Sequence, residues 1–236
     1  MTVKPAYLVD FDGTVTTEDI SYELAVQLAG EGYDEIDRVY RNKEITIREW
    51  LWRTVKLLPP DREMLLSKSF NWTSIRPGFE RFLEHARSQG SPVIVASDGF
   101  GFYIEPILEK SGLLDQVTTV YRNDTVLNHE GRLEVKMPHA HSICPVCGNC
   151  KAFHVVNLKK QGYPVIYVGD GSNDRYGASW GDHVCAREQL LQYSRKYNFA
   201  HSPWDDFYDI INVGTPELQD CSESSLCCPL GRGVKE

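Results

Sequence analysis

Apolar residues in this chain follow two different spacings. Short runs made mostly of apolar residues are typical of buried parallel strands, and such runs occur at 6–9, 92–96, 117–121, 164–168 and 183–186. Between most of these runs, apolar residues repeat every three or four positions, as they do along one face of a helix. Strands that alternate with helices predict an α/β fold with a doubly wound parallel sheet, in which 183–186 is the last strand.

One long segment, 16–72, departs from this alternation because it has helical repeats and no strand pattern. Within it, Thr46 and Glu49 have the spacing of a helix capping box. We therefore predict a helical cap at 16–72, inserted into a core domain formed by 1–15 and 73–236. The small hydrophobic core of this cap is expected to contain three tryptophans, Trp50, Trp52 and Trp72.

Two stretches of the predicted core stand apart from the strand–helix units. Residues 123–136 are typical of a β-hairpin, with Glu130 and Gly131 at its turn. The tail at 214–236 is polar with few apolar residues, so we expect it to be loosely held.

Composition narrows the class of protein. A hydrophobic content of 42% in 236 residues is ordinary for a globular protein, and no stretch approaches the ~18 apolar residues of a membrane span. The N-terminus lacks a secretory signal pattern, so we expect a cytoplasmic location and no membrane partner. The net charge of −8 argues against nucleic acid as a partner, because no basic stripe is present to neutralise phosphates. An anionic substrate would need local cations to attract it.

Candidate chemistry begins where the first predicted strand ends. Asp10 and Asp12 lie two residues apart, so their carboxylates point to the same side of an extended chain. Like charges this close repel unless a cation lies between them. Gly13 and Thr14 then permit a sharp turn and supply a hydroxyl group. The pattern favours a divalent metal site or a carboxylate with a chemical task.

Two further predicted strands also end in polar residues. Ser97 follows the second apolar run, and Asp170 with Asp174 follows the fourth. Ligand sites of doubly wound sheets lie beyond the carboxyl ends of the strands, so we expect these side chains to meet Asp10 and Asp12 in one crevice. Asp10 and Asp170 offer hard oxygen ligands for Mg²⁺, which also retains water and substrate phosphate as ligands.

Phosphate-binding groups are predicted at two helix starts. Lys151 opens a helix and adds a full positive charge to its N-terminus. Ser97 and the backbone amides of Asp98 and Gly99 lie where another helix is expected to begin. Together with two carboxylates and a metal, these groups suit phosphoryl transfer. One carboxylate attacks phosphorus and forms an aspartyl phosphate, and the other transfers the leaving-group proton.

Four stretches resemble, in order and spacing, the motifs of the haloacid dehalogenase-like (HAD) hydrolase superfamily. They are Asp-Phe-Asp-Gly-Thr at 10–14, Ser97, Lys151 and Gly-Asp-Gly-Ser-Asn-Asp at 169–174. The resemblance extends from residue 6 to about residue 186 and implies an HAD-like α/β core. It implies that Asp10 is the nucleophile and Asp12 the general acid/base, a residue that the dehalogenase branch lacks. Ser97 and Lys151 would then hold the phosphate.

The same resemblance implies supporting residues. The Mg²⁺ ligands that it implies are Asp10, the backbone carbonyl of Asp12, and Asp170. Asp174 would orient Lys151 or a metal-bound water, and Asn173 would lie near the substrate. The helical segment resembles the C1 cap of the phosphoserine phosphatase group, in which Asp19 matches the position of a substrate-facing acid.

The run at 139–151, His-Ala-His-Ser-Ile-Cys-Pro-Val-Cys-Gly-Asn-Cys-Lys, resembles the approach to the motif lysine in two HAD subgroups. One comprises methionine-salvage phosphatases acting on 2-hydroxy-3-keto-5-methylthiopentenyl-1-phosphate, and the other phosphoethanolamine/phosphocholine phosphatases. Trp204-Asp205-Asp206-Phe207-Tyr208 also resembles the salvage subgroup, which we favour. Asp19 would suit a cationic amine better than a neutral methylthio-ketone.

The seven cysteines are an odd number, which argues against a full disulfide framework. Cys144, Cys147 and Cys150, together with His139 or His141, have the residue types of a structural Zn²⁺ site. A reversible disulfide and plain packed thiols are the alternatives for this cluster.

The leading hypothesis is a Mg²⁺-dependent phosphomonoesterase for a small metabolite. A phosphomutase or phosphotransferase would use the same chemistry with another acceptor. Phosphoserine is a further candidate substrate. A non-catalytic metal- or partner-binding protein on the same fold is the hypothesis from another class, although all four motifs retain reactive residues. The sequence indicates no oligomeric state.

Overall fold

A computed structural model of the chain describes residues 4–219 and shows one seven-stranded sheet in the order β4-β3-β2-β1-β5-β6-β7. The strands are β1 (Ala6–Val9), β2 (Val93–Phe100), β3 (Thr119–Leu127), β4 (Leu133–Lys136), β5 (Val165–Gly169), β6 (His183–Ala186) and β7 (His201–Pro203). Neighbouring strands pair in parallel, except that β3 and β4 pair antiparallel. The predicted α/β doubly wound fold is confirmed.

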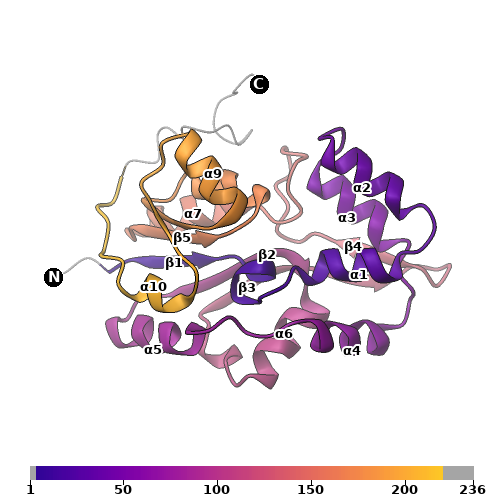
Figure 1. The fold of residues 1–236 in the computed structure, drawn as a ribbon, viewed down its shortest axis with the longest axis horizontal. Helices are drawn as coiled ribbons and strands as arrows, with labels where there is room; N and C mark the ends of the chain where they lie inside the picture. Colours follow the sequence, from indigo (N-terminus) through magenta and orange to yellow (C-terminus); the bar gives the residue numbers. More distant parts are fainter. Residues whose placement is uncertain (1–3, 220–236) are drawn as a thin grey trace.

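Helices cover both faces of the sheet (Figure 1). They are α1 (Ile20–Leu28), α2 (Tyr33–Arg41), α3 (Ile47–Val55), α4 (Arg62–Trp72), α5 (Phe79–Gln89), α6 (Gly101–Lys110), α7 (Lys151–Lys160), α8 (Arg175–Ala178), α9 (Glu188–Lys196) and α10 (Phe207–Ile211). Short helical turns lie at η1 (Phe11–Val15), η2 (Leu114–Gln116) and η3 (Ser172–Asp174). Within residues 4–219 no helix is long and apolar enough to cross a bilayer.

The two faces of the central strand belong to different hydrophobic cores. Side chains alternate along a strand, so Tyr7 and Val9 point into the core that contains α5, α6 and α10. Ala6 and Leu8 point into the second core, which contains α7 and α9. Because β1 is buried on both faces, its carboxyl end is held rigidly in the middle of the sheet.

The proposed cap, 16–72, supplies α1 to α4. The chain leaves the sheet region at Thr16 and returns at Ile75, and these two residues form an antiparallel bridge. Figure 1 shows α2 and α3 on the same side of the sheet as α7 and α9, whereas α4 lies beside α6 on the other side. The side chain of Thr46 caps α3 by accepting a hydrogen bond from the Glu49 amide, which is half of the predicted capping box, while the Glu49 carboxylate accepts a hydrogen bond from Arg53.

The structure corrects four details of the sequence analysis. The strand at 183–186 is followed by the short strand β7, so it is not the last. β2 continues beyond the predicted run at 92–96, through Ser97 to Phe100, and a sequence-based end of the fourth cap helix near Leu66 is wrong because α4 continues to Trp72. Trp52 is 53% exposed and lies under the Lys56 ammonium instead of in a core. In the predicted tail, 220–236 lies outside the described residues.

Candidate active site

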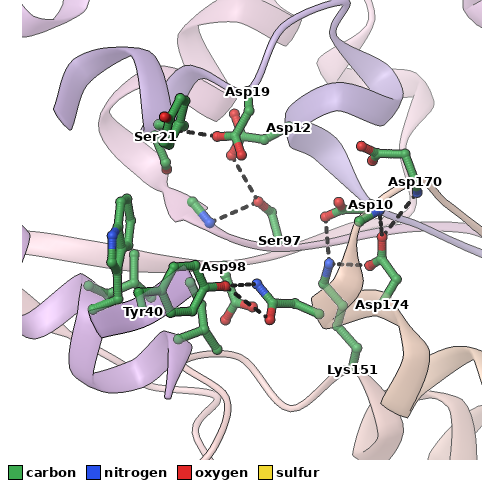
Figure 2. A pocket seen from close by; sticks show the side chains of 17 residues that line it. Asp10, Asp12, Asp19, Ser21, Tyr40, Ser97, Asp98, Lys151, Asp170 and Asp174 are labelled. Carbon is green, nitrogen blue, oxygen red and sulfur yellow. Dashed lines mark hydrogen bonds and ion pairs between the residues drawn. The ribbon is translucent and has the colours of Figure 1, made fainter. Parts of the chain in front are cut away.

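The carboxyl ends of β1, β2 and β5 open into one pocket, whose other walls come from α1, α2, α3 and α7 (Figure 2). The residues of all four motifs line it together, as the sequence predicts. Its lining is strongly acidic and contains the aspartates Asp10, Asp12, Asp19, Asp98, Asp170 and Asp174. Lys151 is the one cationic side chain among the described residues that line this pocket.

The turn after β1 brings the first motif against the fourth. Gly13 has a φ of +74°, a left-handed conformation that favours glycine. A Cβ atom at this position would lie 2.6 Å from Asp170 Oδ2. Thr14 Oγ1 donates a hydrogen bond to Asp170 Oδ1 over 2.6 Å. Position 13 therefore has to be glycine for Asp170 to approach Asp10 this closely.

A buried arginine stabilises the same turn through hydrogen bonds to its backbone. Arg76 donates to the carbonyl oxygens of Gly13, Thr14 and Thr16 at 2.6, 2.8 and 3.1 Å. Its guanidinium also lies 5.5 Å from the centre of the Trp204 ring. The sequence analysis missed Arg76, because its partners are backbone oxygens and leave no pattern of side chains to recognise.

Lys151 is the electrostatic centre of the pocket. It is the first residue of α7, and its ammonium donates to Asp10 Oδ1 and Asp174 Oδ1, both at 2.6 Å. Burial alone would lower the pKa of Lys151, but Asp10 and Asp174 more than offset this and hold its pKa well above the usual value. The predicted association of Asp174 with Lys151 is present in the structure.

Three carboxylates surround this single ammonium. Oxygens of Asp10, Asp170 and Asp174 lie within 4.8 Å of one another. Burial, followed by repulsion from Asp174, raises the pKa of both Asp10 and Asp170, the latter to about 7. Hard oxygen donors with an excess of negative charge fit a divalent cation such as Mg²⁺. The cluster contains Asp10 and Asp170, which we predicted to be Mg²⁺ ligands, and also Asp174.

The fourth-motif loop is fixed around Asp174, which is 1% exposed. Besides Lys151, its carboxylate accepts hydrogen bonds from the Tyr167 hydroxyl at 2.6 Å and from the amides of Asp170 and Gly171 at 3.1 and 3.0 Å. These four donors satisfy the buried carboxylate of Asp174 and fix its orientation. It therefore acts as a fixed support for both Lys151 and Asp170.

Asp12 lies across the pocket from this cluster. Its Oδ1 atom accepts a hydrogen bond from the Ile20 amide at 3.1 Å, and its Oδ2 atom accepts one from the Tyr103 hydroxyl at 2.5 Å. Burial, together with the charge of Asp19, raises the pKa of Asp12 to about 8. The carboxyl group of Asp12 therefore carries a proton near neutral pH, in contrast to an ordinary aspartate.

The second motif differs from the prediction in where its strand ends and its helix begins. Because β2 runs to Phe100, α6 begins at Gly101 and not directly after Ser97. The Gly99 amide donates to Ser97 Oγ at 2.9 Å, and Ser97 Oγ lies 3.4 Å from Asp12 Oδ2. The carboxylate of Asp98 accepts a hydrogen bond from the backbone amide of Asn149 at 2.7 Å. The hydroxyl of Ser97 thus faces the pocket with its own orientation fixed by Gly99.

Asn149 connects the second and third motifs and was also missed from the sequence. It is fully buried, and its side-chain amide nitrogen donates to the carbonyls of Ser97 and Tyr121 at 2.9 and 2.8 Å. Its side-chain oxygen lies 2.7 Å from His154 Nε2. Burial lowers the pKa of His154 to about 3, so the ring is neutral and donates to Asn149. This network sets the distance between Ser97 and Lys151.

The outer wall of the pocket comes from the proposed cap. Asp19 caps α1 by accepting a hydrogen bond from the Tyr22 amide at 2.9 Å, and it lines the pocket beside Tyr22. Asn173 Nδ2 donates to the Tyr40 hydroxyl at 3.0 Å. The predicted position of Asn173 at the pocket is therefore observed, and it joins α2 to the fourth-motif loop.

The zinc hypothesis for the cysteine cluster is not supported. Cys144, Cys147 and Cys150 are all buried. In the part of the chain that the structure describes, the aspartate cluster is the single group of metal-ligating side chains close enough to share an ion. His141 instead accepts hydrogen bonds through Nδ1 from the amides of Ile143 and Cys144, which fold the loop locally.

The acidic cluster predicts that the stability of the metal-free protein depends on pH in an unusual way. The pKa values of Asp12 and Asp170 are raised in the folded chain, to about 8 and about 7. Their contribution to stability is therefore complete below about pH 4 and is lost as the pH rises through these values, by on the order of 1 kcal/mol per pH unit for each group. We expect the melting temperature of the metal-free protein to fall between about pH 6 and about pH 8.5.

Mg²⁺ should reverse this loss, because the cation replaces the protons between the carboxylates. Thermal melts with EDTA and with Mg²⁺, at both pH values, measure the effect. The increase in melting temperature on adding Mg²⁺ should be larger at about pH 8.5. A metal-free melting temperature that stays constant or rises across this range would contradict the assignment.

Several known phosphatases are similar to this chain in sequence. The family described as Putative Phosphatase matches residues 6–193. A 2-hydroxy-3-keto-5-methylthiopentenyl-1-phosphate phosphatase of Exiguobacterium sibiricum is 31% identical over 216 residues, which cover 90% of this chain and 96% of the relative. The protein of the same name from Bacillus pumilus is 31% identical over 210 residues, covering 88% and 89% of the two chains.

Solved structures show the same fold. A substrate-bound phosphoserine phosphatase complex superposes with a TM-score of 0.67 at 20% identity, covering 89% of this chain and 98% of that structure. A phospho-aspartyl intermediate analogue of phosphoserine phosphatase gives a TM-score of 0.66 at 21% identity, with the same coverage. These structures share the α/β fold of this chain.

Proposed function

Because this chain belongs to the Putative Phosphatase family, we propose that it is a Mg²⁺-dependent phosphatase that hydrolyses a small phosphomonoester through an aspartyl phosphate at Asp10. One observation carries this proposal. The buried ammonium of Lys151 contacts both Asp10 and Asp174 at 2.6 Å, beside Asp170 and opposite a second carboxyl group, Asp12. A nucleophile, a phosphate-binding cation, a metal-ligand set and a proton donor thus share one pocket.

In the first step, the Asp10 carboxylate attacks phosphorus and the bond from phosphorus to the ester oxygen breaks. Lys151 holds Asp10 Oδ1, so Oδ2 is the oxygen available for attack. Asp12 gives its proton to the departing ester oxygen. Ser97 and Lys151 donate hydrogen bonds to the phosphoryl oxygens. Mg²⁺ bound by Asp10 and Asp170, with the Asp12 carbonyl, would offset charge repulsion of about 4 kcal/mol per charge pair at ~4 Å.

In the second step, the Asp12 carboxylate removes a proton from water as the water attacks phosphorus. The bond from phosphorus to Asp10 breaks, which regenerates the Asp10 carboxylate and releases inorganic phosphate. The raised pKa of Asp12, about 8, suits both roles because the group is protonated before the first step and can regain a proton in the second.

For the substrate we propose 2-hydroxy-3-keto-5-methylthiopentenyl-1-phosphate. The proposal is supported by relatives that bear this name and are about as long as this chain. The pocket also has an apolar side, formed by Ile47, Trp50 and Leu51, against which a methylthio group can pack. The substrate is then a small metabolite, as expected for a cytoplasmic enzyme.

A second candidate is a phosphate ester with a cationic amine, such as phosphoethanolamine or phosphocholine. Asp19 and Asp98 line the pocket with the rings of Tyr22 and Tyr40. Carboxylates beside aromatic faces favour an ammonium group. Phosphoserine fits less well, because Lys151 is engaged by two carboxylates and no other described lining residue is available to pair with the substrate carboxylate.

A substrate panel tests the proposal. Purified protein with Mg²⁺ is expected to hydrolyse p-nitrophenyl phosphate and to lose activity in EDTA. Among metabolites, kcat/KM should be at least about 10-fold higher for the salvage intermediate than for phosphoethanolamine, phosphocholine or phosphoserine. A preference for the amines would establish the second candidate instead. Absence of hydrolysis of every ester at any metal concentration would refute the phosphatase assignment.

A further inference from the structure

A tyrosine outside the four motifs contacts the proposed acid/base residue. Tyr103 lies on α6 and is fully buried, and its hydroxyl donates a hydrogen bond to Asp12 Oδ2 at 2.5 Å. The same hydroxyl lies 2.8 Å from Ser21 Oγ, on the first turn of α1. Tyr103 therefore connects the acid/base carboxyl with the first helix of the proposed cap.

The direction of this chain of hydrogen bonds follows from the number of protons. A phenol has one proton, and Tyr103 uses it for Asp12. The bond to Ser21 then requires the serine hydroxyl to donate to the tyrosine oxygen. Both oxygens of Asp12 are thus fixed from the same helix start, because Oδ1 accepts from the Ile20 amide and Oδ2 is held through Tyr103 by Ser21.

Packing leaves the tyrosine little freedom. Its ring lies between 5.2 and 6.3 Å from the rings of Phe11, Phe100 and Phe102. The hydroxyl reaches Asp12 through space that Gly99 leaves open. A Cβ atom at Gly99 would lie 2.0 Å from the Tyr103 oxygen and 2.4 Å from Asp12 Oδ2. A contact enclosed in this way holds one geometry.

We propose that Tyr103 is a positioning residue, which orients the Asp12 carboxyl group towards the departing ester oxygen. Through its hydrogen bond to Tyr103, Ser21 makes this orientation depend on the position of α1. The inference rests on the proposed phosphatase function. It assigns Tyr103 no contact with substrate. Without its hydroxyl, one oxygen of Asp12 loses its short hydrogen bond and the carboxyl group can rotate about the bond to Cβ.

Esters with different leaving groups distinguish the positioning role of Tyr103 from a purely structural role. An alkoxide is a strong base and needs a proton as it departs, whereas p-nitrophenolate is a weak base and needs little help. The value of kcat/KM reports the steps up to leaving-group departure. Hydrolysis of the aspartyl phosphate follows and is the same for every ester, so kcat alone would not distinguish the two roles.

The test compares wild type with Tyr103→Phe on p-nitrophenyl phosphate and on the alkyl ester that the wild type hydrolyses fastest. We expect kcat/KM to fall about 10- to 100-fold for the alkyl ester and less than about 3-fold for p-nitrophenyl phosphate. Tyr33→Phe is the matched control, since the buried Tyr33 hydroxyl has no hydrogen-bond partner among the described residues. This control should leave both values within about 2-fold of wild type.

Equal losses on the two esters, or no loss on either, would overturn the proposal. Ser21→Ala provides a second measurement should Tyr103→Phe not fold. It should lower kcat/KM for the alkyl ester by about 3- to 10-fold, again more than for the aryl ester. A wild type that hydrolyses no ester defeats the proposed function itself. An active wild type with an unchanged leaving-group preference in both variants defeats the inference alone.

Discussion

Asp10→Asn is expected to reduce phosphatase activity at least about 10⁴-fold, because an amide oxygen is a poor nucleophile towards phosphorus. The shape of the side chain is preserved, and its oxygen can still accept a hydrogen bond from Lys151, which lies 2.6 Å from the native Oδ1. The loss should therefore appear in kcat and not in folding. Release of p-nitrophenol in Mg²⁺ measures it, together with melting curves of both proteins.

Acid-quenched samples from reactions with ³²P-labelled ester provide an independent measurement. Wild type should retain covalently bound label during turnover, and Asp10→Asn should retain none. Asp61→Asn is a suitable control, because Asp61 caps α4 away from the pocket and asparagine caps a helix equally well. Activity that persists in freshly purified Asp10→Asn would exclude Asp10 as the nucleophile.

Lys151→Met should have the second largest effect, on both activity and stability. Methionine fills the volume of the lysine chain but leaves the carboxylates of Asp10 and Asp174 buried without their shared cation. Breaking a buried ion pair from one side costs about 3–5 kcal/mol of the free energy of unfolding. Activity should fall at least about 10²- to 10³-fold, as when a donor to the developing charge is removed.

Lys159→Met separates the two effects. Lys159 is also buried, and its ammonium pairs with Asp182 at 2.8 Å and donates to the Trp180 carbonyl, but it does not line the pocket. Denaturant titrations should show a loss of stability similar to that of Lys151→Met. Well below its unfolding transition, the folded Lys159→Met protein should keep wild-type kcat/KM within about 3-fold. Comparable activity in the two variants would contradict the role given to Lys151.

The sequence predicted which residues meet in the pocket, because polar residues at the carboxyl ends of parallel strands lie at one edge of the sheet. Asp10 and Asp170 follow adjacent strands of the sheet, so once the strand order is known they have to approach one another. Lys151 was predicted from its place at a helix start, and the helix that leads to β5 begins at the same edge.

Residues that act through the backbone or from within a hydrophobic helix could not be recognised. Tyr103 occupies an apolar position of α6, and only the three-dimensional path of that helix brings its hydroxyl to Asp12. Arg76 binds three carbonyl oxygens and Asn149 binds two, and residue spacing along the sequence does not reveal hydrogen bonds to backbone oxygens. β7 was missed because three residues are too few for a hydrophobic pattern.

The excess of aspartates over cations in the pocket also constrains the order of events in a catalytic cycle. With six aspartates and one lysine around it, a doubly charged ester is repelled until a cation has been added. For the proposed phosphatase we therefore expect the metal to bind before the ester, so that removal of the metal abolishes substrate binding and does not only slow the reaction.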